Sequence, residues 1–337
     1  MKKKLVLVLP VHFKLYEGIV NNLRNSNYEI SLLFLTDQPY KYKSFREKLY
    51  ALIQKNIFNR KDIKYQLAKI KNGKDIEIEF EKQQEIFDYV FIIRPDLFTR
   101  ETLLKLKSKT KKIVAYQWDG LNRFSDVFYL ISIFDRFGVF DIDDYSKYKN
   151  IHKNIVLVPN FYLEDKEFSN SNPEEKVFFI GSFLAERIED IVKIAKYLKS
   201  IDIVTDIRIY SNSRSTQNKY NSDIDFFTEK VNYLDVLKLV KNSTVLLDFE
   251  NRIHNGLSFR IFEGIYYKKK ILTNNPLVKS YDFYHPNNIF VLENNNFAEI
   301  KTFLSLEYVD IDESVIEKYS FSNWLDTILD NVSQRNT

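Results

Sequence analysis

The residues best suited to chemistry lie in one short segment, positions 254–264, where a glycine turn precedes a predicted helix. On that helix Arg260 and Glu263 stand three residues apart, so they share one face with Gly264 and Tyr267. A helix N-terminus and an arginine both bind phosphate, and a carboxylate accepts hydrogen bonds from ribose hydroxyls. This face therefore predicts a nucleotide site, in which Gly264 leaves room for the ligand.

The other residues of the same helix are apolar. Ile261, Phe262 and Ile265 lie on its opposite side, and we expect them to pack against a sheet. Lys268–Lys270 end the helix with positive charge and lead into a strand at Ile271–Thr273. The segment is thus predicted as a strand, a glycine turn, a helix and a second strand.

A group-transfer reaction also needs a base that takes a proton from the acceptor. Asp119 follows a predicted buried strand and precedes Gly120, so its carboxylate is expected at the end of a sheet. His12 follows Pro10 at the end of the first predicted strand and is the second candidate. For each of them the alternative is a purely structural role, such as a turn or a cap. His254 borders the glycine turn, where it could contact a bound phosphate.

The composition excludes several classes of function. With 337 residues the chain is too long for a single core of ordinary size, so two domains are expected. The absence of cysteine excludes disulfides, thiolate metal sites and a cysteine nucleophile. The four histidines are scattered, without metal-ligand spacing. No apolar run reaches the length of a membrane span, and we expect a cytoplasmic protein.

The positive charge of the chain is concentrated in one segment. Between positions 41 and 74 there are eleven lysines and arginines and two acidic residues, a net charge of +9, whereas the whole chain carries only +4. One interpretation is a solvated helical face. The other is a patch for an anionic partner, namely a membrane surface, an anionic glycan or a nucleic acid.

Hydrophobic patterns predict two serial arrays of alternating strands and helices, the signature of an α/β fold with parallel sheets. A polar stretch at 169–175 is the best linker, which separates a domain at 1–168 from a second one at 176–312. Residues 313–337 are expected to form a helix, anchored by Trp324, that packs back on the first domain. Ligands are expected at the carboxyl ends of the strands, in the crevice between the two halves.

Two motifs of the second half resemble a known family. Phe179-Ile180-Gly181-Ser182 followed by Arg187, and Gly256 to Glu263, are similar to the glycosyl transferase group 1-like domain of bacterial GT-B fold glycosyltransferases. The resemblance covers about residues 175–330 and is one of architecture over the first half. It implies two Rossmann-like domains facing across a cleft, and transfer of a sugar from a nucleotide sugar to a capsule, lipopolysaccharide or O-antigen acceptor.

The resemblance also implies roles for individual residues. Glu263 would bind the ribose of the donor, and Tyr233 would lie against its base. The residues implied at the diphosphate and elsewhere on the donor are Gly181, Ser182, Arg187, Asn255, Gly256, Leu257, Ser258 and Arg260. Asn255 stands where one large retaining subgroup has a second glutamate, which argues against membership of that subgroup.

No cofactor and no metal are expected. The Asp-x-Asp pattern of metal-dependent transferases occurs three times, at 141–143, 223–225 and 310–312, which shows how easily it arises in this chain. In the GT-B family an arginine and a helix dipole neutralise the donor diphosphate instead.

Three hypotheses follow for the whole chain. The first is a metal-independent glycosyltransferase with a UDP-, GDP- or CMP-linked donor and a glycan or lipid-linked glycan acceptor, with possible peripheral membrane contact through 41–74 and no nucleic acid partner. The second is a nucleotide-sugar epimerase of the same fold, which would form product without an acceptor. The third is a non-catalytic polyanion-binding protein, whose binding would fall steeply with salt.

Overall fold

The computed structural model describes residues 2–11, 14–24, 26–35, 40–83, 86–165, 173–250, 255–293 and 296–329. The chain divides into two compact units. Unit 1 comprises 1–12, 25–158 and 328–337, and unit 2 comprises 13–24 and 159–327. The division therefore lies near Val158, about ten residues before the linker suggested by the sequence, and most of that linker falls outside the described residues.

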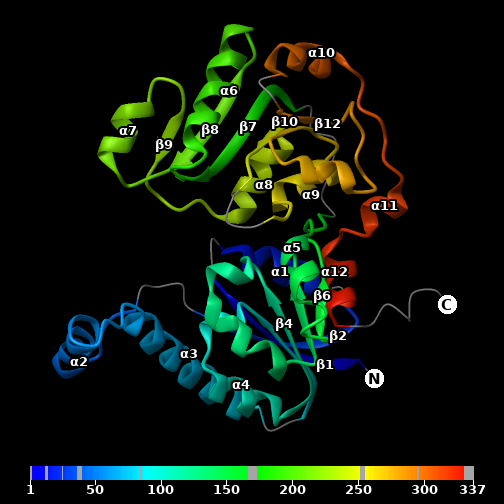
Figure 1. The fold of residues 1–337 in the computed structure, drawn as a ribbon. Coiled ribbons are helices and arrows are strands. Elements are labelled where there is room, and N and C mark those ends of the chain that lie inside the picture. The colour runs from blue at the N-terminus through cyan, green and yellow to red at the C-terminus, as the bar shows by residue number, and fades with distance from the viewer. Residues whose placement is uncertain are drawn as a thin grey trace. The chain divides into compact units, whose positions relative to one another are not determined.

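Unit 1 is built on a parallel sheet in the order β2-β1-β3-β4-β5-β6 (Figure 1). Its strands are β1 (Lys3–Pro10), β2 (Tyr28–Leu35), β3 (Phe87–Ile93), β4 (Thr110–Gln117), β5 (Arg136–Val139) and β6 (Ile155–Leu157). In the centre of the sheet, Leu7 of β1 pairs with Leu32 on one side and with Phe91 on the other. The central strands are continuous apolar runs because helices cover both faces of such a sheet.

The helices of unit 1 are α2 (Phe45–Asn56), α3 (Ile63–Glu81), α4 (Arg100–Lys107) and α5 (Ile142–Tyr148). Ile76 and Phe80 of α3 and Leu103 of α4 are buried in one core with Val90 and Ile113 of the sheet. Ser44 caps α2 by accepting a hydrogen bond from the Glu47 amide at 3.2 Å, and Thr99 caps α4 in the same way. The basic segment at 41–74 contains α2 and the larger part of α3.

Unit 2 repeats the architecture with the order β12-β11-β10-β7-β8-β9. Its strands are β7 (Glu174–Ser182), β8 (Thr205–Tyr210), β9 (Asp225–Phe227), β10 (Ser243–Asp248), β11 (Lys270–Thr273) and β12 (Ile289–Val291). The helices that follow β7 in the chain are α6 (Ile188–Ser200), α7 (Arg214–Tyr220), α8 (Tyr233–Lys241), α9 (Phe259–Tyr266), α10 (Ile300–Ser305), α11 (Glu313–Glu317) and α12 (Phe321–Ile328). Helix α6 packs on one face through Ile191 and Leu198, and α8 packs on Phe178 and Leu246.

Helix α1 (Leu15–Leu23) belongs to unit 2 although it connects β1 to β2 of unit 1. A Cβ atom at Gly18 would lie 2.3 Å from Leu163 and 3.5 Å from Leu234, so only glycine permits this approach. Asn22 adds two hydrogen bonds, donating to the Glu164 carbonyl at 3.1 Å and accepting from the Glu164 amide at 2.7 Å. The helix is thereby fixed to a segment more than a hundred residues further along the chain.

The C-terminal segment divides between the units. Residues up to 327 cluster with unit 2, where the buried Trp324 ring lies 4.5 Å from Phe161 and 5.7 Å from Phe321, centroid to centroid. Residues from Ile328 onward cluster with unit 1, where Arg136 donates to the Ile328 carbonyl at 3.2 Å. Among the described residues, none of the helices has the length and apolarity that crossing a bilayer requires.

Candidate functional site

The topology of unit 2 points to one place for a ligand. Its strand order reverses between β7 and β10, since β8 and β9 continue on one side and β11 and β12 on the other. At such a switch point the loops after the two strands run in opposite directions and leave a crevice at their carboxyl ends. Residues 181–187 lie at the end of β7 and just after it, and residues 249–258 follow β10, with 251–254 outside the described residues. Both segments contain residues implied by the motifs.

Arg187 ties the two strand ends together. Its guanidinium donates to the Ser182 carbonyl at 2.9 Å and to the Phe249 carbonyl at 3.2 Å. A Cβ atom at Gly181 would lie 2.9 Å from the Arg187 Nη2, so the glycine makes room for this arginine. Burial lowers the pKa of Arg187, although the charge of Asp248 opposes the effect. The Nε of Arg187 is buried and has no hydrogen-bond partner among the described residues, so its donor is unsatisfied in this structure.

The N-terminus of α9 is fixed by a capping residue that is itself held. Ser258 Oγ accepts from the Arg260 amide at 3.2 Å and donates to Asp248 at 2.6 Å. The second oxygen of Asp248 accepts from the Thr273 hydroxyl at 3.0 Å. One buried carboxylate at the end of β10 therefore positions both the start of α9 and the end of β11. Sequence reasoning missed Asp248 and Thr273, and the only signal was their place at the ends of predicted strands.

Glu263 lies at the centre of a buried polar cluster. One carboxylate oxygen accepts from the Tyr233 hydroxyl and the other from the Arg260 guanidinium. Burial raises the pKa of Glu263 against the opposing effects of Arg260 and Tyr233. Burial and the charge of Glu263 together raise the pKa of the Tyr233 phenol well above its ordinary value. The structure thus brings Tyr233, which the resemblance implied separately, to the Arg260–Glu263 pair.

The surroundings of α9 differ from the expectation of one open face. A Cβ atom at Gly264 would lie 2.6 Å from Ile271 and 3.3 Å from Leu246, so this glycine faces the sheet rather than a ligand. The apolar residues Ile261, Phe262 and Ile265 are buried in one core with Ile271 and Ile289 of the sheet, as expected. The prediction that Gly264 leaves room for a ligand was wrong, because this glycine serves close packing of the helix on the sheet. Glu263 is consequently only 1% exposed.

The turn before α9 is held through its backbone. The Gly256 carbonyl accepts from Asn275 at 3.3 Å, and the Leu257 carbonyl accepts from Asn160 at 2.9 Å. Asn255 directly precedes this turn at the start of the described segment, and His254 lies outside the described residues. Among the glycines of the described ranges none has a positive φ, so Gly256 is not required for a left-handed turn.

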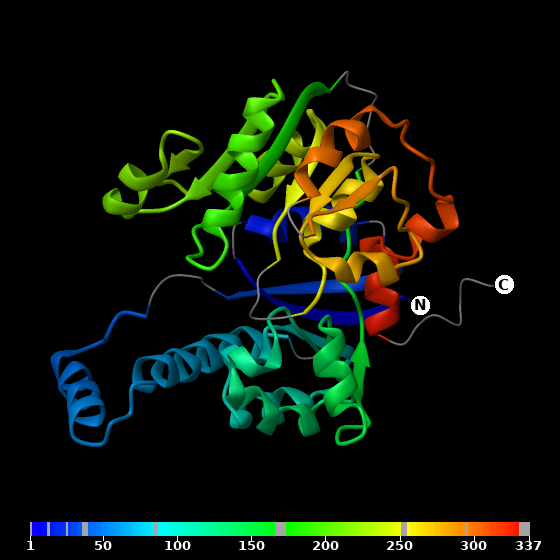
Figure 2. The same ribbon diagram turned by 45° about the horizontal axis from the view of Figure 1, so that its top comes forward.

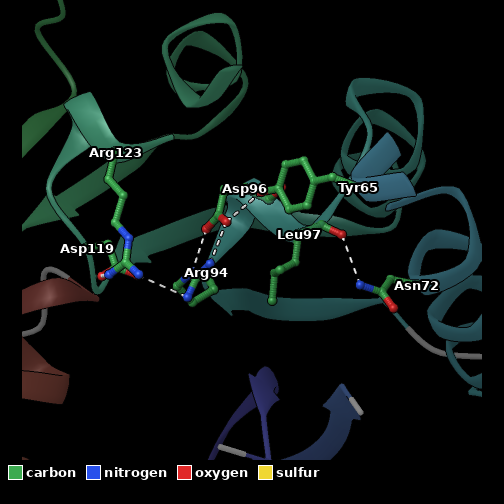
Figure 3. A network of polar contacts seen from close by, with 7 residues as sticks. All are labelled: Tyr65, Asn72, Arg94, Asp96, Leu97, Asp119 and Arg123. Atoms are coloured by element: carbon green, nitrogen blue, oxygen red, sulfur yellow. Dashed lines mark hydrogen bonds and ion pairs between the residues drawn. The ribbon is translucent and has the colours of Figure 1, made fainter. Parts of the chain in front are cut away.

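Asp119, the first candidate base, lies in unit 1 within a network of charged groups (Figure 3). Its two oxygens pair with Arg94 at 3.0 Å and with Arg123 at 2.6 Å. Arg94 in turn binds Asp96 through two hydrogen bonds of 2.7 Å, and the Tyr65 hydroxyl donates to Asp96 at 2.9 Å. Asp119 is therefore a bridging carboxylate between two arginines.

Arg94 occupies the switch point of the unit 1 sheet, which lies between β1 and β3. It follows β3 directly and has a left-handed backbone with φ of 67°, a conformation that costs a non-glycine residue energy. Burial lowers the pKa of Arg94, but the hydrogen bonds and charge of Asp96 outweigh it and hold that pKa above its ordinary value. His12, the second candidate base, lies outside the described residues.

Sequence reasoning missed Tyr65, Arg94 and Asp96 as parts of this network. The available signal was Arg94-Pro95-Asp96 immediately after a predicted buried strand, where the hydrophobic pattern indicated only that the strand ends.

Two of the three Asp-x-Asp sequences begin or end in helix caps, because Asp141 caps α5 and Asp312 caps α11. Within the described ranges no group of three or more acidic or histidine side chains could hold a metal ion.

No family model matches this chain, and no curated protein matches it either. Several solved structures are similar to it. AviGT4, a glycosyltransferase involved in avilamycin A biosynthesis, is similar with a TM-score of 0.60 and 9% identity, over 98% of this chain and 96% of that one. A Rickettsia africae glycosyltransferase gives a TM-score of 0.53 and 13% identity, over 99% of both chains.

A third similar structure is an epimerase. The Methanocaldococcus jannaschii UDP-GlcNAc 2-epimerase, in complex with UDP-GlcNAc and UDP, gives a TM-score of 0.52 and 14% identity, over 94% of this chain and 98% of that one. At such identities the likeness shows the fold alone. The chain has the GT-B fold, with two six-stranded parallel sheets and flanking helices.

Proposed function

We propose that this chain is a glycosyltransferase that binds a nucleotide-sugar donor in unit 2 and transfers the sugar to a glycan or lipid-linked glycan acceptor of a capsule, lipopolysaccharide or O-antigen. The observation that carries the proposal is the position of Arg187, Ser258 and Arg260 around the switch point of the unit 2 sheet. Support comes from the likeness in fold to two glycosyltransferases and to an epimerase solved with UDP-GlcNAc and UDP.

In this proposal the donor diphosphate meets the N-terminus of α9 and the Arg187 guanidinium. The first backbone amides of a helix and the Nε of Arg187 are donors suited to phosphate oxygens. As the bond between sugar and diphosphate breaks, negative charge develops on the leaving group, where these fixed donors stabilise it. No metal is needed for this step, so we expect turnover to persist in EDTA.

Glu263 has two roles in the proposal. Its carboxylate holds Arg260 near the start of α9, and it is the group that we expect to bind the ribose. Each of its oxygens accepts one hydrogen bond and has capacity for another. Because Glu263 is only 1% exposed, a ribose hydroxyl reaches it only when the side chain of Arg260 or Tyr233 moves.

Calorimetry with UDP, GDP, CMP and CDP tests the donor site. We expect one nucleotide to bind, and Glu263→Ala and Arg187→Gln each to weaken that binding at least tenfold. Glu293→Gln is the matched control, because Glu293 is an exposed acid of the same unit, paired with Lys279 on the surface. Unchanged affinity in both site variants would remove the donor site from this place.

For the base we propose Asp119, with His12 as the second candidate. Accepting the acceptor proton would require Asp119 to exchange one arginine partner for the acceptor hydroxyl. Asp119→Asn should then abolish turnover and leave nucleotide affinity unchanged, whereas Arg123→Gln should retain turnover. Near-normal turnover of Asp119→Asn would assign the residue to the structure of unit 1 instead.

A nucleotide-sugar epimerase is the second candidate, favoured by the likeness to the Methanocaldococcus enzyme over nearly the whole of both chains. Incubation of nucleotide sugars without an acceptor separates the two. Conversion to an isomeric nucleotide sugar would identify an epimerase, while release of the nucleotide only when an acceptor is added would identify a transferase.

A further inference from the structure

Helix α2 in unit 1 carries an apolar face that the described residues of its unit leave exposed. Phe45, Leu49, Leu52 and Ile53 are spaced at i, i+4, i+7 and i+8, so they form one stripe along the helix. These side chains are 79%, 47%, 46% and 40% exposed. A monomeric surface rarely gathers four large apolar side chains on a single helix face without a binding partner.

The opposite face of α2 packs against the rest of unit 1. Ala51, on that face, is the buried residue of the helix, and Glu47 and Gln54 beside it are half-buried. Glu47 also accepts hydrogen bonds from the Tyr40 hydroxyl at 2.7 Å and from the Lys43 amide at 2.6 Å. The orientation of the helix is thus fixed by its polar side, with the apolar stripe turned outward.

Cationic residues border the apolar stripe. By helical spacing, Lys48 and Lys55 lie along one edge and Arg46 along the other. The two residues after the helix, Ile57 and Phe58, are exposed as well. From position 41 to 61 there are seven lysines and arginines against one acidic residue.

The position of α2 leaves this face accessible within its unit. Helix α3 extends away from the sheet, and α2 lies at its far end (Figures 1 and 2). The helix has 12 residues and so is about 18 Å long, too short to cross a bilayer but long enough to lie in its interface.

We propose that α2 is a membrane-docking helix that lies in the headgroup region of an anionic phospholipid bilayer. Phe45, Leu49, Leu52 and Ile53 would enter the acyl boundary, while Lys48, Lys55 and Arg46 contact lipid phosphates. An apolar stripe bordered by cations is the pattern of interfacial helices, since such a surface offers hydrocarbon and negative charge together.

The charge and the size of this helix face favour a bilayer over a soluble polyanion and over a second copy of the chain. A soluble polyanion, such as an acidic glycan or a nucleic acid, would satisfy the lysines but would leave the apolar stripe in water. A second copy of the chain would bring two strongly cationic segments together and would bury only one short helix on each side, well below the area of about 1,200 Å² that stable dimers need.

Sedimentation with lipid vesicles tests the proposal on the full chain. We expect binding to vesicles of phosphatidylcholine with about 30 mol % phosphatidylglycerol, and little binding to phosphatidylcholine alone, because cations near an anionic surface each contribute about fivefold. Phe45→Gln/Leu49→Gln/Leu52→Gln, which retains the charge, should lose binding at least tenfold. Lys48→Gln/Lys55→Gln should lose binding to a similar extent and become less sensitive to salt.

Two surface variants of the same unit are the controls. Ile151→Gln changes a side chain that is 69% exposed elsewhere in unit 1, and Lys153→Gln removes a cation beside it. Both should bind vesicles like the wild type. Circular dichroism of every variant establishes that folding is unchanged.

Fluorescence locates the helix directly. Phe45→Trp should show a blue shift with anionic vesicles and quenching by brominated lipids, whereas Ile151→Trp should show neither. Equal binding to both vesicle types, full binding by the triple glutamine variant, or an unquenched Trp at position 45 would each overturn the proposal. Sedimentation does not depend on catalysis, so this test is independent of the proposed transfer reaction.

Discussion

At the scale of single residues, both units place arginine and carboxylate groups at the switch points of their sheets. In unit 2, Arg187 spans the ends of β7 and β10, and in unit 1, Arg94 follows β3 and pairs with the fully buried Asp96. Buried charges of this kind are retained only with partners of good geometry, because removing one partner leaves an uncompensated charge. These side chains therefore define the local shape of each strand end.

A buried carboxyl in unit 1 predicts a measurable pH dependence. Burial raises the pKa of Asp144 to about 6, although the Leu121 amide, which donates to it at 2.7 Å, acts in the opposite direction. The folded state therefore holds this proton more tightly than the unfolded state, so stability is lost as pH rises from about 4 through 6. We expect Asp144→Asn to melt at a higher temperature than the wild type at pH 7, with the difference vanishing near pH 4.

The control for this prediction is Asp143→Asn, since Asp143 is the exposed neighbour of Asp144. Its melting temperature should follow that of the wild type across the same pH range. A difference between Asp144→Asn and the wild type that stays constant with pH would show that Asp144 does not titrate in this window.

At the scale of elements, α9 is set by how closely it approaches the sheet. Gly264 allows this approach because it has no Cβ atom. A Cβ atom at this position would lie only 2.6 Å from the Ile271 side chain. Ser258 fixes the start of the helix through Asp248 of β10, while Gly264 lies against Ile271 of β11. The polar cluster of Glu263 depends on this depth, since Tyr233 comes from the neighbouring helix α8.

Gly264→Ala should accordingly push α9 from the sheet and destabilise the chain by about 1–3 kcal/mol in urea unfolding, because an added methyl group overpacks the core. The closest atom is the terminal methyl carbon of Ile271, which valine lacks. The double variant Gly264→Ala/Ile271→Val should therefore be more stable than the sum of the two single changes predicts. Simple additivity would contradict the proposed contact.

The sequence predicts elements better than it predicts contacts. Apolar spacing predicts a helix at Leu15–Leu23 and a strand at Tyr28–Leu35, and α1 and β2 have these bounds. Helix α7 has no such signal, since only Tyr220 of its seven residues is buried. For α6 the apolar spacing predicts a helix that includes Leu184, but the helix begins at Ile188 because Arg187 turns back to the strand ends.

For the candidate site, local spacing was informative and distant pairing was not. The relation between Arg260 and Glu263 follows from their separation along a helix and is present in the structure. The hydrogen bond from Tyr233 to Glu263 joins residues 30 positions apart, and that between Ser258 and Asp248 depends on the loop between them. Such pairs arise from the packing of the sheet, which a single sequence does not encode in any local pattern.

At the scale of the whole molecule, neither unit is a continuous stretch of the chain. Unit 2 needs α1, which comes early in the chain, and unit 1 needs Ile328, which comes late. A Cβ atom at Gly138 of β5 would lie 2.4 Å from the Ile328 side chain, so this late residue packs closely on the unit 1 sheet. A division at a single linker therefore does not yield two complete units.

Separate expression of unit 2 tests this arrangement. The fragment 159–327 should melt at a lower temperature than the same fragment with residues 14–24 joined through a glycine-serine linker, because α1 covers Leu163 and Leu234. Gly18→Leu in the joined fragment should remove the gain, since no side chain fits at that position. Equal melting of the two fragments would mean that α1 adds nothing to unit 2.

The long separation between α1 and its partner has a consequence for synthesis on the ribosome. Asn22 and Glu164 are 142 residues apart, which at roughly 5–20 residues per second corresponds to about 7–28 s of translation. During that interval the apolar side of α1 has left the exit tunnel but has no surface on which to dock. Unit 1 in turn waits for Ile328, which follows its partner Arg136 by 192 residues, so the nascent chain completes neither core early.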